Sequence, residues 1–120
     1  MAEVFEDTRV VTNPGPDPLR VWFEPWGMPH FLPPGESFRV VGRSPQAGTI
    51  EVVESGGTVA VYAWAGSTLM VFNGTALVED LSVAVPELPP GQSTRSFVHF
   101  LFGGPGDPKP DASPAAATGR

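Results

Sequence analysis

Two histidines, His30 and His99, are the first candidates for chemistry in a chain that has no cysteine. A zinc or similar site needs three or four ligands, so a carboxylate such as Glu24 would have to join both histidines. The chain has no H-x-H or HExxH spacing, and His99 alternates with apolar residues such as Phe97. This alternation is typical of a half-buried histidine on a strand. The sequence therefore predicts no metal site and no cofactor.

The residue patterns of covalent and acid–base catalysis are also missing. No G-x-S-x-G elbow is present, and Ser37, which follows a Pro-Gly turn, has no evident base. The adjacent carboxylates Glu6-Asp7 and Glu79-Asp80 would point to opposite faces of a strand. A chain without cysteine has no thiolate nucleophile. We expect no catalytic residues and a protein that is not an enzyme.

Four aromatic residues are candidates for binding: Trp22, Trp26, Tyr62 and Trp64. In the run 19–24, Trp22 falls on the face that carries charged residues, so we expect its ring to be partly exposed. Trp and Tyr rings on a surface can stack on a sugar or grip a side chain of a partner. The alternative is that these rings cover the rim of a small core.

The elements that must position these residues are short strands joined by tight turns. A chain of 120 residues fits one domain, and its 15 prolines and 14 glycines break helices and punctuate strands. The formal net charge of −6, without a basic cluster, argues against nucleic-acid binding. No apolar run approaches the roughly 20 residues of a membrane-spanning helix, so we expect no membrane partner.

Turn signals divide residues 1–102 into about eight strands. Asn73-Gly74, flanked by apolar runs, predicts a type I′ hairpin. A turn at 55–57 separates two further runs, and we expect these four strands to form one antiparallel meander. The strands are expected near 8–13, 18–24, 36–42, 49–54, 58–64, 67–72, 75–79 and 93–102, with no helical period. These patterns predict an all-β fold, a small antiparallel β-sandwich or jelly roll in a single domain.

The proline-rich stretch 25–35 is expected to be a structural corner, in which Gly27 and Gly35 allow the chain to turn. A short internal repeat begins within it: LPPGES at 32–37 is echoed by LPPGQS at 88–93. Both Pro-Gly pairs match a type II turn. We interpret the repeat as two equivalent corners, each leading into a strand.

Several predicted strands are apolar on both faces, in the runs VAVYAW, LMVF and FVHFLF. A sheet in a simple sandwich buries only one face, so the second faces need cover from the chain's own loops or from another subunit. Candidates for such an interface are Met70, Phe72, Val98, Phe100 and Phe102.

Residues 103–120, GGPGDPKPDASPAAATGR, have no large apolar side chain and form a Pro/Gly/Ala-rich C-terminal arm. Such a segment cannot bury enough surface to offset its ordering entropy, so we expect it to be disordered unless bound. Because proline restricts φ beforehand, an extended arm of this kind is suited to docking on a neighbour.

The stretch FEPWGMPHFLPPGESFRVV resembles a motif of short uncharacterised bacterial proteins, in which EPWG and a Pro-Gly turn link two strands. The resemblance spans about residues 19–74 and implies no known activity. The strand–Pro-Gly–strand layout is similar to that of cupins, which implies a cupin-like shape. Cupin metal chemistry does not carry over, because no histidine lies between Glu36 and Val40. A small acidic all-β chain with such an arm also resembles the decoration proteins of phage capsids, which implies docking on a larger scaffold.

Two functions are therefore expected as alternatives. The first is a non-enzymatic binding or assembly module, a homo-oligomer or a subunit docked on a protein scaffold such as a capsid. The second is a small-ligand-binding protein with a degenerate cupin-like pocket, lined by Trp64, His30 and His99. The acidic start MAEVFEDTR has no apolar stretch, so we expect no secretory signal and a cytoplasmic or virion-associated protein.

Overall fold

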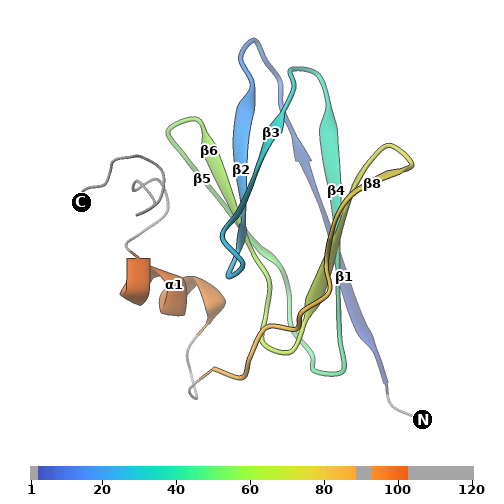
Figure 1. Cartoon of the computed structure of the whole chain (residues 1–120), viewed down its shortest axis with the longest axis vertical. Helices are drawn as coiled ribbons and strands as arrows, with labels where there is room; N and C mark the ends of the chain where they lie inside the picture. Colours follow the sequence, from blue (N-terminus) through green and yellow to red (C-terminus); the bar gives the residue numbers. More distant parts are fainter. Residues whose placement is uncertain (1–2, 89–92, 103–120) are drawn as a thin grey trace.

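The fold is a sandwich of two four-stranded β-sheets with one helix on its flank (Figure 1). The computed structural model describes residues 3–88 and 93–102, with the backbone alone for residues 99–102. The elements are β1 Phe5–Thr12, β2 Leu19–Glu24, β3 Met28–Leu32, β4 Ser37–Ser44, β5 Glu51–Ser55, β6 Thr58–Tyr62, β7 Thr68–Asn73, β8 Ala76–Leu81 and α1 Thr94–Phe102. The prediction of a small all-β sandwich is confirmed.

The first sheet has the strand order β1-β4-β7-β8 and the second the order β3-β2-β6-β5. All pairs are antiparallel except β2 and β6, which run parallel. The predicted four-stranded meander is wrong, because β5 and β6 belong to the second sheet and β7 and β8 to the first. Residues 63–67 carry the chain across the sandwich, and their backbone bonds to Val85 hold the crossing in place.

Both predicted hairpins form, with the second shifted by one residue. Ser55 pairs with Thr58 across Gly56-Gly57, and both glycines have positive φ, as a type I′ turn requires. Asn73 pairs with Ala76, so the two-residue turn is Gly74-Thr75 rather than Asn73-Gly74. Gly74, at φ +63°, is the first turn residue, where a type II′ hairpin favours glycine.

Strand β3 lies inside the stretch predicted to be a corner. Its Pro29 pairs opposite Trp22 of β2, and β3 forms an edge of the second sheet. An edge strand tolerates proline because one side of its backbone needs no ladder hydrogen bonds. The corner prediction is therefore wrong for residues 28–32, while the Pro-Gly turn before β4 is present, with a backbone hydrogen bond from Glu36 to Pro33.

The predicted strand over 93–102 is instead the helix α1. Ser93 caps it: its hydroxyl accepts a hydrogen bond of 3.1 Å from the amide of Ser96. A short apolar run is ambiguous between strand and helix, and this cap is the signal that was missed. The two repeats LPPGES and LPPGQS thus lead into different elements, and Pro90-Gly91 lies outside the described residues.

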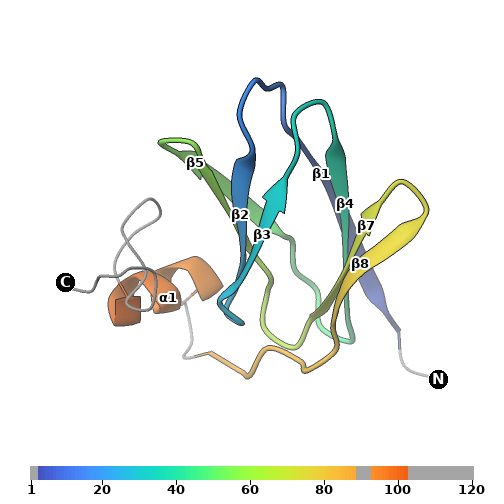
Figure 2. The ribbon, with the colours of Figure 1, turned by 45° about the horizontal axis from the view of Figure 1, so that its top comes forward.

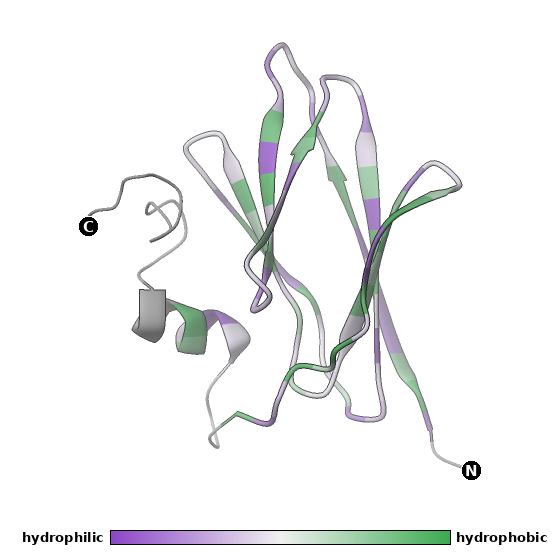
Figure 3. Ribbon diagram, in the orientation of Figure 1, coloured by the Kyte–Doolittle hydropathy of each residue, from purple (hydrophilic) through white to green (hydrophobic). Residues whose placement is uncertain are grey.

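The core lies between the two sheets, which face each other in Figure 2, and Figure 3 shows hydrophobic residues along the strands of both. It includes Phe23 and Val61 of the second sheet and Val40 and Leu69 of the first. Helix α1 covers the opposite face of the second sheet, where Val98 packs with Ala60 and Tyr62. The second apolar face of β6 therefore receives its cover from the chain itself.

No helix within residues 3–88 or 93–102 combines the length and apolar character needed to span a bilayer.

Candidate functional site

The four aromatic residues predicted to form a binding surface do not form an exposed platform. Trp22, Tyr62 and Trp64 are buried, and Trp26 is half-buried with its indole N–H donating to the carbonyl of Val83 at 2.9 Å. The expectation that Trp22 would be partly exposed is wrong, because it lies on the sheet face that α1 contacts. Tyr62 and Trp64 instead line a common pocket.

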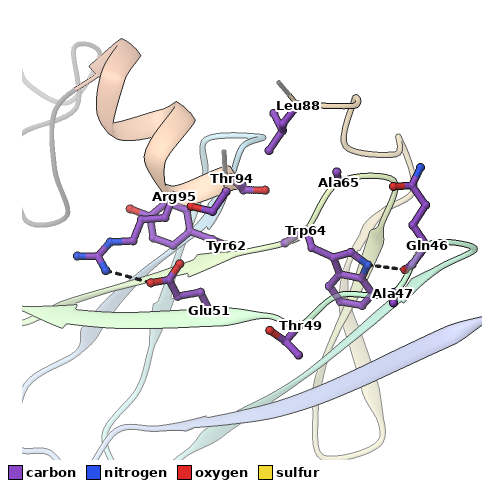
Figure 4. Close-up of a pocket in the computed structure, with 12 residues that line it drawn as sticks. Gln46, Ala47, Thr49, Glu51, Tyr62, Trp64, Ala65, Leu88, Thr94 and Arg95 are labelled. Atoms are coloured by element: carbon purple, nitrogen blue, oxygen red, sulfur yellow. Dashed lines mark hydrogen bonds and ion pairs between the residues drawn. The ribbon is translucent and has the colours of Figure 1, made fainter. Parts of the chain in front are cut away.

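This pocket, of about 240 Å³, lies where α1 begins, at the end of β6 (Figure 4). Strand β5 provides Glu51, and β6 with the chain that follows it provides Tyr62 and Trp64. The link between β4 and β5 adds polar and small residues, and α1 closes one side. The lining is Gln46, Ala47, Thr49, Glu51, Tyr62, Ala63, Trp64, Ala65, Leu88, Ser93, Thr94 and Arg95. Three segments distant in sequence thus converge on one space.

The indole of Trp64 is fixed in this pocket. Its N–H donates to the carbonyl of Gln46 at 2.8 Å. Gly48 lies against the ring so closely that a Cβ there would be 2.1 Å from Cδ1, and a Cβ at Gly42 would be 2.7 Å from Cζ3. Because two glycines allow the backbone to approach the ring, Trp64 is a rigid wall of the pocket rather than a mobile side chain.

Two carboxylates and one guanidinium act on Tyr62. Arg95 donates to Glu51 at 3.0 Å across the mouth of the pocket, with both side chains partly exposed (Figure 4). Burial raises the pKa of Tyr62 to about 12, the carboxylates of Glu24 and Glu51 add to the rise, and Arg95 opposes it. The phenol therefore stays protonated at neutral pH and can donate a hydrogen bond.

Thr94 was not among the predicted site residues. It is 4% exposed, and its hydroxyl is buried without a hydrogen-bond partner among the described residues. A buried hydroxyl normally has a partner, because leaving it unpaired costs about 1–3 kcal/mol. Once α1 is recognised, the sequence order Ser93-Thr94 marks Thr94 as the first helical residue, and this is the signal that would have pointed to it.

His30 lies elsewhere, between the sheets. Its Nε2 is 3.0 Å from Oε1 of Glu79, and its ring contacts Phe23 and Phe38 edge-on or nearly so. It does not line the pocket with Trp64, contrary to the cupin-like expectation, and the side chain of His99 lies outside the described residues. Among the described side chains, no group of three or more His, Asp or Glu residues is placed to hold a metal ion.

A wider pocket, of about 760 Å³, lies between the β1–β2 loop and the β5–β6 turn. Asn13 organises the loop through its side chain, which donates to the carbonyls of Asp17 and Leu32 and accepts from the amide of Gly15. Its lining combines three prolines and three glycines with polar residues from both segments, among them Asn13, Asp17 and Glu54.

The outer face of the first sheet carries an apolar band, defined here as Val10, Val41, Met70, Phe72 and Leu77. Register places Val10, Arg39, Phe72 and Leu77 in one row across the four strands, and Thr8, Val41, Met70 and Asp80 in the next. Val10 is 63% and Leu77 51% exposed. Val41 is buried, at 7% exposed, and Met70 and Phe72 are half-buried, so the exposed part of the band is Val10 and Leu77 on the two edge strands.

Two of the five predicted interface residues, Met70 and Phe72, lie in this band. Both are half-buried, and the guanidinium of Arg39 lies 4.4 Å from the ring centre of Phe72. Val98 is a residue of α1 and is buried against the second sheet instead. The side chains of Phe100 and Phe102 lie outside those described. The C-terminal arm, 103–120, also lies outside the described residues.

Comparisons with protein-family models, curated proteins and solved structures gave no match to this chain. The arguments on function therefore rest on the residues and their geometry.

Proposed function

We propose that this protein is a non-enzymatic assembly module that associates with a second copy of itself through the apolar band of the first sheet. The observation that carries the proposal is that Val10 and Leu77 leave apolar surface exposed on the outer face of the first sheet, whereas the matching face of the second sheet is covered by α1. Exposed apolar patches on folded domains commonly mark interaction surfaces.

The charges around the band suit a symmetric contact. Arg39 lies in one row, and Asp80, of opposite charge, lies in the next row on the edge strand β8; both are exposed. In a twofold dimer the same surface is used by both subunits, so Arg39 of each copy can meet Asp80 of the other. Arg43, at the other end of β4, is already paired with Glu6 at 2.9 Å.

Docking on a larger scaffold such as a capsid would use the same band and is the second form of this proposal. It is supported by the same exposed side chains and by the resemblance in kind to capsid decoration proteins. The two forms differ in one measurable property, because only the first makes the purified chain associate.

The test is sedimentation velocity of the full chain over a range of concentrations, together with Leu77→Glu. A carboxylate buried in an apolar contact must be desolvated, so we expect the dissociation constant to rise about tenfold or more. Val83→Glu is the matched control: Val83 is 74% exposed but outside the band, and its substitution should leave association unchanged.

A wild-type chain that stays monomeric at high micromolar concentration would exclude self-association and leave only the scaffold form. Association that is equally strong in Leu77→Glu and in wild type would show that a different surface is used.

A further inference from the structure

Asn73-Gly74 is a dipeptide in which the backbone amide of one residue can attack the side chain of the other. The chain has two asparagines, Asn13 and Asn73. Asn13 is followed by Pro14, whose nitrogen carries no hydrogen and cannot act as this nucleophile. Asn73 is followed by Gly74, which has no side chain to crowd the reacting atoms. The sequence therefore offers one reactive asparagine and one internal control.

The turn of the β7–β8 hairpin leaves the attacking nitrogen accessible. Figure 2 shows this turn at the periphery of the molecule, and Gly74 is exposed. Asn73 pairs with Ala76, and the hydrogen bond of a two-residue turn joins the residues of this closing pair, so it does not use the N–H of Gly74. A Cβ added at Gly74 would meet no atom of the described residues within 4 Å. The N–H of Gly74 thus lies in an open turn.

One contact restrains the side chain that would react. Nδ2 of Asn73 donates to Oε1 of Glu36 at 2.7 Å, and this bond links the hairpin to the residue that precedes β4. Glu36 is itself anchored, since its amide donates to the carbonyl of Pro33 and its carbonyl accepts from the amide of Asn13. A carboxylate that accepts from Nδ2 holds the carboxamide in place and supplies no proton to a departing nitrogen. Glu36 is therefore placed to slow the reaction.

We propose that Asn73 is a site of spontaneous deamidation in the folded protein, and that the contact with Glu36 slows this reaction. The nitrogen of Gly74 loses its proton and forms a bond with Cγ of Asn73, while the bond from Cγ to Nδ2 breaks. The departing nitrogen takes up the proton and leaves as ammonia, so the first product is a cyclic succinimide. Water then opens either carbonyl of the ring and gives aspartate or isoaspartate at position 73.

Either product changes the contact with Glu36. The new carboxylate cannot donate the hydrogen bond that Nδ2 gave, and it lies close to a second negative charge. Isoaspartate also adds a methylene group to the backbone where Asn73 pairs with Ala76, which disturbs the register of the turn. The modified chain carries one more negative charge than the −6 of the original chain and should melt at a lower temperature. Because the reaction needs no second copy, the inference is independent of the proposed self-association.

The experiment is incubation of the purified full chain at neutral and at mildly alkaline pH, with the products separated by anion exchange and mapped by peptide mass spectrometry. We expect a more acidic form to accumulate, in which an amide has become a carboxylate at Asn73 and not at Asn13. It should form faster at the higher pH, because the nitrogen of Gly74 must lose its proton to attack. Electron-transfer fragmentation of the same peptide distinguishes isoaspartate from aspartate.

Three variants test the role of Glu36. Glu36→Ala removes the contact and should deamidate about threefold to tenfold faster, the range that the loss of one hydrogen bond allows. Glu36→Gln should react at a rate between those of wild type and Glu36→Ala, because a neutral acceptor bonds more weakly than a carboxylate. Ser37→Ala is the matched control, since it removes the neighbouring side chain's bond of 2.9 Å to Thr12 and should keep the wild-type rate.

The proposal is overturned if Asn73 stays intact in the folded chain while it deamidates in the chain unfolded by urea, because the fold would then protect it completely. It is also overturned if Asn13 reacts as fast as Asn73, or if Glu36→Ala reacts no faster than Ser37→Ala. If Glu36→Ala does not fold, the same comparison is made between Glu36→Gln and Ser37→Ala.

Discussion

At the scale of the residue, the clearest effect of the fold is on the pKa of the Tyr62 phenol, which burial raises. This is the chain's single tyrosine, and its side chain is 2% exposed beneath α1. Burial is the main cause of its raised pKa, so ionisation requires either bringing a charge into the interior or moving the helix away.

We expect Tyr62 to make the protein less stable in alkali. Below pH 10 the phenol is neutral in both folded and unfolded chains, and its contribution is fully present. Between pH 10 and about 12 the unfolded chain loses this proton first, so stability falls as pH rises through this window. Two pKa units correspond to about 2–3 kcal/mol.

The measurement is the melting temperature of wild type and Tyr62→Phe at several pH values from 8 to about 12, together with the tyrosinate absorbance of wild type. The chain has one lysine, Lys109, and arginine stays charged in this range, so few other groups interfere. A decline of equal steepness in both proteins would show that Tyr62 is not its cause.

At the scale of the element, the β7–β8 hairpin depends on one backbone conformation. Gly74 has φ +63°, and an added Cβ would meet no atom within 4 Å. The cost of Gly74→Val is therefore conformational strain rather than a clash, about 1–3 kcal/mol for a β-branched residue at positive φ. For a domain of this size the melting temperature should fall by several degrees, because about 1 kcal/mol corresponds to roughly 4–8 °C.

Thr75→Val is the matched control, since Thr75 follows in the same turn and its substitution should cost much less. Thermal unfolding by circular dichroism measures both variants. If Gly74→Val melts within a degree or two of wild type, the turn does not have the described geometry.

The same hairpin shows how far sequence patterns reach. Asn73-Gly74 between apolar runs was sufficient to predict two paired strands, and period-2 alternation placed β2, β4, β5 and β6. Patterns failed where the position of a segment in the fold determines its structure. Pro29 is tolerated in a strand because β3 is at the edge of its sheet. Residues 94–102 are helical because Ser93 caps them and because the second sheet offers an apolar face for the helix to cover.

The pocket was harder to predict than the strands. Tyr62 and Trp64 were recognised by residue type as candidates for a binding surface, because the sequence does not show that α1 lies over β6. Thr94 and Arg95 could not be assigned while their segment was thought to be a strand. The assignment of strands to a sheet likewise depends on contacts between residues distant in sequence. In this chain, residues 63–67 cross from one sheet to the other, but their sequence does not differ from that of a hairpin turn.

At the scale of the whole molecule, the described domain and the C-terminal arm are expected to be separable. The core clusters and both sheets are formed within the described residues, and the arm has no large apolar side chain to add to them. Removing residues 104–120 should therefore leave the melting temperature nearly unchanged while weakening assembly, if the arm docks on a neighbouring subunit.

Differential scanning calorimetry and sedimentation velocity of the shortened and full chains measure these two effects separately. The matched control is replacement of 104–120 by a Gly/Ser segment of equal length, which keeps the volume but removes the prolines. If the shortened chain melts well below the full chain, the domain does not fold independently of the arm. If the shortened chain associates as strongly as the full chain, the arm takes no part in assembly.

The parallel pairing of β2 with β6 has a consequence for how the chain is made. A ribosome releases the polypeptide from its N-terminus, so β2 and β3 emerge long before the strand that lies beside β2 in the finished sheet. After β3, residues 33–57 must be synthesised before β6, and during that interval the β2–β3 hairpin has neither its parallel neighbour nor a completed sheet opposite it. Its apolar face and the unpaired edge of β2 are then exposed to chaperones. The same edge can also pair with β6 of another nascent chain, and this pairing would exchange strands between two copies.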